Sequence, residues 1–96
     1  MNNQITESCG DVFKDFGFSP ELSDKLTIKS CLMGEIDSYI KKKGITQDQA
    51  AKLMGVSRPR ISDVIRGKID KFTIDSLVDM LTKAGLHISL NVEDAA

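Results

Sequence analysis

The sequence predicts a mainly α-helical domain, a bundle of four to five helices followed by one C-terminal β-strand. Three observations support this fold class. Apolar residues recur at helical spacing between residues 19 and 85, capping residues and glycines divide this stretch into short segments, and the final segment alternates between polar and apolar residues. With 96 residues, of which 41% are hydrophobic, the chain can form one modest core and is too apolar for a disordered protein.

The first helix is expected to begin at Ser19-Pro20-Glu21, which supplies a capping serine, a proline at the first helical position and an acid in the first turn. Lysines 41–43 and Gly44 predict its end, because cations stabilise the negative end of a helix and glycine readily adopts the left-handed conformation that terminates it. The expected buried face comprises Leu22, Leu26, Met33, Ile36 and Ile40, widened by Ile28, Leu32 and Tyr39.

Two short helices separated by a glycine are expected next. Thr46 and Gln49 form a capping box for the first of them, which Gly55 ends. The other opens at Val56-Ser57 and ends at Gly67. Their expected buried residues are Ala50, Leu53, Met54, Ile61, Val64 and Ile65.

The last helix is expected to open at Phe72-Thr73 and to end at Gly85. The segment His87–Val92 then alternates strictly, which predicts a β-strand. A lone strand leaves its backbone groups unpaired, so it must pair with residues near Val12-Phe13 or with another chain. We favour pairing with its own copy across a two-fold axis. The expected dimer contacts are Ile88, Leu90 and Val92, and the expected buried residues of the preceding helix are Ile74, Leu77, Val78, Leu81 and Ala84.

Charge is distributed unevenly along the chain. Residues 41–71 carry nine bases against three acids, a net charge of +6, whereas residues 1–24 and 72–96 carry −4 and −3. A basic centre favours an anionic partner, and acidic ends offer a surface to a basic protein.

Several function classes are excluded at this point. No apolar run is long enough to span a bilayer and the start of the chain lacks the features of a signal peptide, so we expect a cytoplasmic protein with no membrane partner. Cys9 and Cys31 lie far apart with no histidine nearby, which predicts reduced thiols and no metal site. The lone histidine, His87, has no catalytic set around it, so we expect neither enzymatic activity nor a cofactor.

Residues 46–66 read as helix, glycine turn, helix, an arrangement whose second helix can enter the major groove of DNA. Arg58 and Arg60 lie in the first turn of that helix, where the macrodipole makes a cation unfavourable. An anionic partner at this helix end reverses the sign of that cost. The segment therefore predicts a DNA-binding helix-turn-helix.

The outward arc of the second helix is polar. Arginine offers bidentate donors to guanine, and a proline can lie against a thymine methyl. Because proline disfavours helical geometry in the residue before it, either Ser57 caps this helix with Pro59 in the first turn or the helix begins at Pro59 itself. The arc comprises Pro59, Ser62, Asp63 and Arg66, with Arg60 on its flank.

The segment Ile45–Gly67 resembles the helix-turn-helix of the lambdoid-repressor (XRE) superfamily, which implies a lambda-repressor-like bundle over about residues 22–85. Other segments extend the resemblance over nearly the whole chain. Val12–Phe18, Ala50–Gly55, Arg60–Ile69 and the closing amphipathic strand resemble small XRE-family antitoxins of HigA type, which pair with RelE/HigB-like ribonuclease toxins. The implied domains are an N-terminal extension, partly flexible, at 1–18, an XRE-type helix-turn-helix domain at 19–85, and a strand and tail at 86–96.

The resemblance implies a role for each matching position. Gln47 matches a contact to the DNA backbone at the groove edge, and Ser57 matches a phosphate-contacting cap. Arg58, Pro59 and Asp63 match the base-reading positions, and a loop after the second helix matches one that grips phosphate. The implied DNA-binding residues are Thr46, Gln47, Ser57, Arg58, Pro59, Arg60, Ser62, Asp63, Arg66, Lys68 and Lys71.

Two positions depart from this pattern. Pro59 cannot donate a hydrogen bond. Asp63 would repel phosphate unless it accepts from a cytosine amine or orients Arg60.

The implied function is that of a dimeric repressor that binds a palindromic operator on double-stranded DNA and is the antitoxin of a toxin–antitoxin module, autoregulating its operon. The alternative is a free-standing XRE-family transcriptional regulator with no toxin partner. Phe13, Phe16 and Phe18 are candidate anchors for a toxin, or else pack onto the first helix.

Overall fold

The computed structural model describes residues 19–94. This part of the chain forms four α-helices and one short 3-10 turn. In chain order the elements are α2 (Pro20–Lys43), α3 (Gln47–Met54), α4 (Arg58–Ile65), η2 (Ile69–Lys71) and α5 (Ile74–Lys83). The prediction of a mainly α-helical bundle is confirmed, and α2, α3 and α5 begin directly after the capping residues that the sequence indicates, Ser19, Thr46 and Thr73.

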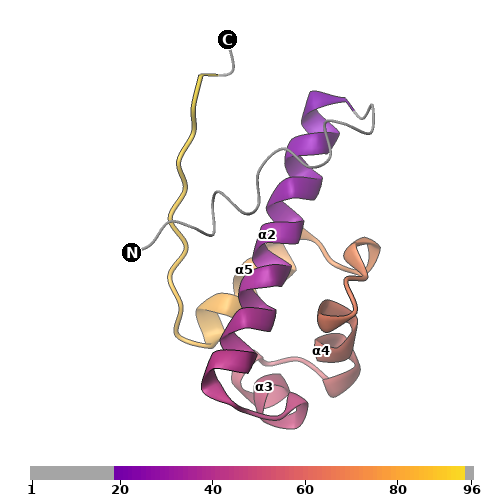
Figure 1. The fold of residues 1–96 in the computed structure, drawn as a ribbon, viewed down its shortest axis with the longest axis vertical. Coiled ribbons are helices and arrows are strands. Elements are labelled where there is room, and N and C mark those ends of the chain that lie inside the picture. Colours follow the sequence, from indigo (N-terminus) through magenta and orange to yellow (C-terminus); the bar gives the residue numbers. More distant parts are fainter. Residues whose placement is uncertain (1–18, 95–96) are drawn as a thin grey trace.

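Helix α2 forms the long axis of the molecule, and α4, η2 and α5 pack against it (Figure 1). Ser19 caps its start, where the serine Oγ accepts a hydrogen bond from the Leu22 amide at 3.2 Å. Gly44 ends it with φ 65°, after three lysines in the last turn. The Tyr39 hydroxyl donates to the Ala84 carbonyl at 3.3 Å and so connects α2 to the end of α5.

Capping boxes open α3 and α5. The Thr46 Oγ1 accepts from the Gln49 amide at 3.1 Å, and the Gln49 side chain accepts from the Thr46 amide at 2.8 Å. Thr73 and Ser76 form the same reciprocal pair at the start of α5, with both distances at 3.1 Å. These bonds satisfy amides that a helix start otherwise leaves unpaired, so two short helices begin at defined residues.

The core draws on every helix of the described chain. Two residues expected inside it, Leu53 and Ile65, are instead 44% and 38% exposed. Each lies at the edge of the buried face: at about 100° per residue, Leu53 sits about 100° around α3 from the buried Met54. Leu22 and Ile28, both expected on the buried face of this helix, are also exposed, at 43% and 37%, because the first turns of α2 project beyond α3 and α4 (Figure 1). The buried apolar residues are Leu32, Met33, Ile36, Ile40, Ala50, Ala51, Met54, Ile61, Val64, Phe72, Leu77, Met80 and Leu81.

The predicted C-terminal strand is wrong for the single chain. Residues 86–94 leave α5 as an irregular extended segment, and the described residues contain no β-strand (Figure 1). Ile88 packs partly against the core, whereas Leu90 is 79% and Val92 89% exposed. The physical reason is that a strand requires a hydrogen-bonding neighbour, and the described part of one chain supplies none here.

The structure also bears on the state of the cysteines. Cys31, half-buried on α2, is disulfide-bonded, so the expectation of two reduced cysteines is wrong. The other cysteine of the chain, Cys9, lies outside the described residues.

Over residues 19–94, every helix is too short or too polar to traverse a bilayer.

Candidate nucleic-acid interface

Helices α3 and α4 are both eight residues long and are joined by a tight turn. Gly55 begins the turn with φ 70°, a conformation that side chains resist, and its amide donates to the Ala51 carbonyl. A β-carbon at Gly55 would also lie 3.1 Å from Cδ of Lys83. Ala50, fully buried, is small enough to let α3 pack closely on the rest of the bundle. The result is two short helices joined by a turn of residues 55–57.

Helix α4 starts at Arg58, with Ser57 as its N-cap and Pro59 as its second residue. This is the first of the two alternatives that the proline leaves open. The Ser57 side chain makes no capping hydrogen bond, and the first turn of α4 contains no acid. The positive end of the helix is therefore not neutralised from within α4.

Arg58 projects from this end into solvent, with a side chain that is 63% exposed. Its Nε lies 3.7 Å from Oδ1 of Asp48, on the first turn of α3, and that carboxylate is 67% exposed. Exposed ion pairs of this kind contribute about 0–1 kcal/mol. Arg58 can therefore exchange Asp48 for an external acceptor at little cost.

Arg60, two residues later, lies in a different environment. Its side chain is half-buried, its guanidinium donates from Nη1 to the Lys71 carbonyl at 2.9 Å, and its Cζ lies 4.3 Å from the centre of the Phe72 ring. Phe72 is itself buried in the core.

Asp63 has a partner other than Arg60. Its Oδ1 lies 3.9 Å from Nζ of Lys68, and its backbone carbonyl accepts from the Lys68 amide at 3.0 Å. Of the two roles considered for this carboxylate, orienting Arg60 does not match the geometry, because Arg60 is held by Lys71 and Phe72. Asp63 instead ties the loop after α4 to the helix.

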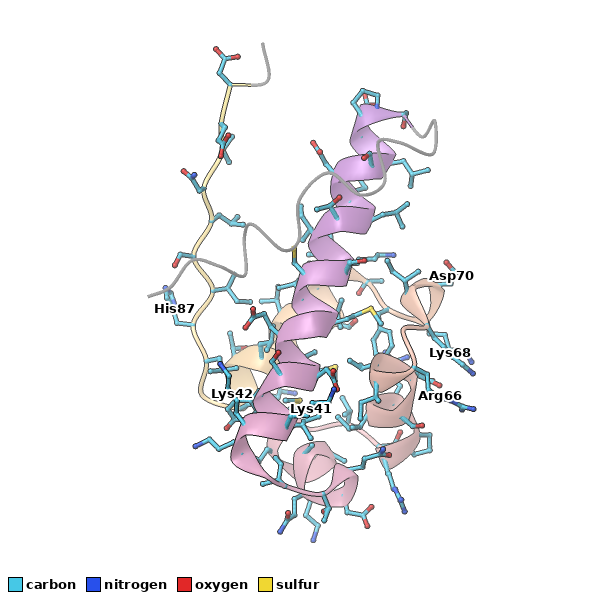
Figure 2. The ribbon with its side chains drawn as sticks, in the orientation of Figure 1. Lys41, Lys42, Arg66, Lys68, Asp70 and His87 are labelled. Atoms are coloured by element: carbon cyan, nitrogen blue, oxygen red, sulfur yellow. The ribbon has the colours of Figure 1, made fainter. Side chains whose placement is uncertain are left out.

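The remaining cations lie around α4. Arg66, the C-cap of the helix, and Lys68 point outward on the side of the molecule formed by α4 and η2 (Figure 2). Lys71 is also exposed and ends η2. His87 lies on the opposite side, on the C-terminal segment (Figure 2).

The polar residues at the two helix starts fill in the surface between these cations. Thr46 uses its Oγ1 as a cap acceptor, and its hydroxyl proton remains able to donate. Gln47 is half-buried at the first position of α3, Pro59 is exposed, and Ser62 is half-buried on α4. The structure thus gathers the sequence-predicted residues on α3, α4 and the loop that ends in η2. Phe13, Phe16 and Phe18 lie outside the described residues.

Sequence reasoning missed two contacts at this surface. Asp48 is the partner of Arg58, and Phe72 is the platform under Arg60. Asp48 falls in the adjacent helix, so no periodic pattern links it to Arg58. Phe72 is predicted only as a residue at the start of the last helix, and its position twelve residues after Arg60 gives no local signal.

Fold and surface together define a helix-turn-helix protein, a class that binds DNA through the second helix of the pair. The chain belongs to a family described as "Helix-turn-helix domain", whose model matches residues 12–93. That span covers the whole bundle and most of the C-terminal segment. A search of curated proteins finds no match to the chain.

Proposed function

We propose that this protein is a sequence-specific transcriptional repressor that reads a palindromic operator with helix α4. One observation carries the proposal: Arg58 extends into solvent from the positive, acid-free first turn of α4, tethered only by an exposed ion pair. A cation in that place is unfavourable for the isolated helix and favourable beside an anion. The family membership supports the DNA-binding part of this reading.

Base reading is assigned to the exposed front of α4. With α4 in the major groove, Arg58 exchanges Asp48 for the two acceptors of a guanine, and the ring of Pro59 contacts a thymine methyl. Ser62 can donate or accept at a neighbouring base edge. Asp63, engaged with Lys68, accepts from a cytosine amine if it reads a base.

Phosphate contacts are assigned to the residues on either side of α4. Gln47, at the start of α3, faces one backbone strand, and the Ser57 hydroxyl, free of any capping role, accompanies it. Arg66, Lys68 and Lys71 face the other strand from the loop after the helix. Such contacts release counterions, so affinity falls steeply with salt.

The operator is proposed to be palindromic because the protein is proposed to be a homodimer. Leu90 and Val92 are almost fully exposed in the single chain, and the segment that carries them is extended. Antiparallel pairing of this segment with its copy would form the predicted strand and cover Ile88, Leu90 and Val92. Two α4 helices about 34 Å apart then meet successive major grooves.

The antitoxin role rests on the resemblance to HigA-type proteins and on the acidic ends of the chain, which favour a basic partner such as a RelE/HigB-like toxin. A regulator of this kind acts in the cytoplasm. Co-expression with the adjacent reading frame tests the role: a small basic protein that copurifies in a fixed ratio, and whose toxicity is suppressed, supports it. If the adjacent reading frame encodes no such protein, the alternative of a free-standing regulator with no toxin partner is favoured.

The DNA-binding proposal is tested by titrating the duplex upstream of the protein's own gene, and a scrambled duplex of equal length, with wild type and Arg58→Ala. We expect Arg58→Ala to weaken operator binding by about 1–3 kcal/mol and to relax sequence preference. Lys68→Ala should weaken both duplexes alike. The matched control is Lys25→Ala, an exposed cation on the projecting part of α2, which should change neither. Equal losses on both duplexes for Arg58→Ala would contradict the base-reading role.

A further inference from the structure

We infer that Arg60 is a positioning residue that holds the phosphate-contacting loop in register with the reading helix, and that it does not itself read a base. The inference deepens the proposed function and rests on it. It concerns the loop of residues 66–72, which runs from the end of α4 to the buried Phe72 and includes Arg66, Lys68 and Lys71.

The Arg60 guanidinium is fixed in two independent directions. Its edge donates to the Lys71 carbonyl at 2.9 Å, and its face lies over the Phe72 ring at 4.3 Å. A planar guanidinium can make an edge contact and a face contact at the same time, which an ammonium cannot. Phe72 is only 2% exposed, so the ring under Arg60 belongs to the hydrophobic core.

These contacts join the first turn of α4 to the far end of the loop, eleven residues later in the chain. Within the loop, Gly67 turns the backbone with φ 74°, and η2 closes with the Phe72 amide donating to the Ile69 carbonyl at 3.3 Å. Lys71 lies on the span between Arg60 and Phe72. Because Arg60 bonds to the Lys71 carbonyl, it helps to fix the position of the Lys71 backbone relative to α4.

The contrast with Arg58 separates the two roles. Arg58 is 63% exposed and has only a 3.7 Å ion pair to give up, whereas Arg60 is half-buried and would have to leave both a hydrogen bond and an aromatic face to reach a base edge. The same contacts account for a second cation in the first turn of α4, because the Lys71 carbonyl and the Phe72 ring already provide it with negative potential.

Removing Arg60 should thus weaken the phosphate contacts and lower the affinity for DNA without changing which sequence is preferred. We expect Arg60→Gln to weaken the operator and a scrambled duplex by a similar factor of about ten, the effect of losing a phosphate contact and its register. Arg60→Lys keeps the charge but loses the flat face, so it should restore little. Phe72→Leu keeps an apolar core residue and removes the ring, and should give the same loss.

The decisive measurement is a double-mutant cycle of Arg60→Gln with Lys71→Ala on the scrambled duplex, with the slope of log affinity against log salt recorded for each protein. If Arg60 acts through Lys71, the double variant should bind about as well as the weaker single variant, and both singles should lose slope. Additive losses would overturn the inference, as would an Arg60→Gln loss confined to the operator.

The matched control is Arg58→Gln in the same cycle, which should be additive with Lys71→Ala. Thermal unfolding of every variant excludes loss of the folded state, and if Arg60→Gln is unfolded the cycle is run with Arg60→Lys. Wild type that binds neither duplex at low salt would refute the proposed function itself. Wild type that binds, with an additive cycle, would refute only the role of Arg60.

Discussion

At the scale of single residues, chemical type decides less than surroundings. Arg58 and Arg60 are identical side chains two positions apart, yet one meets solvent and an exposed carboxylate while the other meets a carbonyl and a buried ring. The sequence predicts both as DNA contacts, because both lie in the first turn of α4, where a cation is unfavourable without an anionic partner. The contact with Phe72 makes Arg60 different from Arg58. Whether Phe72 reaches Arg60 depends on the path of the loop after α4, which helical periodicity does not predict.

Two glycines provide a residue-scale test of the turn. Gly55→Ala places a side chain at φ 70° and within 3.1 Å of Lys83, so we expect a loss of about 1–2 kcal/mol in the free energy of unfolding. Most of that cost is backbone strain, since the Lys83 side chain can shift. Urea unfolding followed by circular dichroism gives the number.

Gly34 is the matched control for this substitution. It lies in the exposed interior of α2, and a β-carbon there meets nothing within 4 Å. Gly34→Ala should therefore stabilise the protein by about 0.5–1 kcal/mol, because alanine loses less backbone entropy in a helix. A Gly55→Ala protein as stable as wild type would mean that the turn adopts another geometry in solution.

At the scale of elements, the helices are predictable because each boundary has a local cause. Capping boxes, a proline after a serine, and positive-φ glycines fix where the helices start and stop, and these signals are read within four residues. Which side faces inward is less predictable. Leu53 and Ile65 belong to two-turn helices in which the width of the buried stripe depends on neighbours distant in sequence.

The capping box of α3 offers a test at this scale. Thr46→Ala removes the acceptor for the Gln49 amide and should cost about 1 kcal/mol of stability. Thr82→Ala is the matched control, because the Thr82 hydroxyl bonds back only to the Val78 and Asp79 carbonyls within α5, interactions of little net value. Thermal unfolding of the two variants should separate them, and equal melting temperatures would show that α3 does not depend on its cap.

At the scale of the whole molecule, the C-terminal segment is where the structure of the single chain differs from the sequence prediction. Alternation of polar and apolar residues predicts a strand, but backbone pairing is a property of two segments, and the sequence of one does not specify the other. In the described part of the chain this segment is extended but unpaired with a neighbouring strand, and Leu90 and Val92 are exposed to solvent. Residues 1–18, with their three phenylalanines, are the other part for which the sequence has a prediction and the described residues have no answer.

The dimer is tested by charging the exposed apolar positions of this segment. The double variant Leu90→Lys, Val92→Lys should be monomeric, and at protein concentrations where each chain is alone its unfolding free energy should be unchanged, because both side chains already meet solvent. Sedimentation equilibrium measures the association. Asn91→Lys, which adds charge on the alternate face of the segment, is the control and should remain dimeric. A double variant that still dimerises would place the interface elsewhere.

The carboxylates beside the reading surface have a consequence for how such a protein searches a genome. Asp48 and Asp63 lie 3.7 and 3.9 Å from Arg58 and Lys68, two of the cations proposed to face DNA, so a duplex that contacts either of these two side chains must replace an existing ion pair. A random stretch offers phosphate alone in exchange, whereas a cognate site adds base contacts. In the proposed repressor, this exchange would shorten visits to unrelated sequence and would leave more of the protein available for its target.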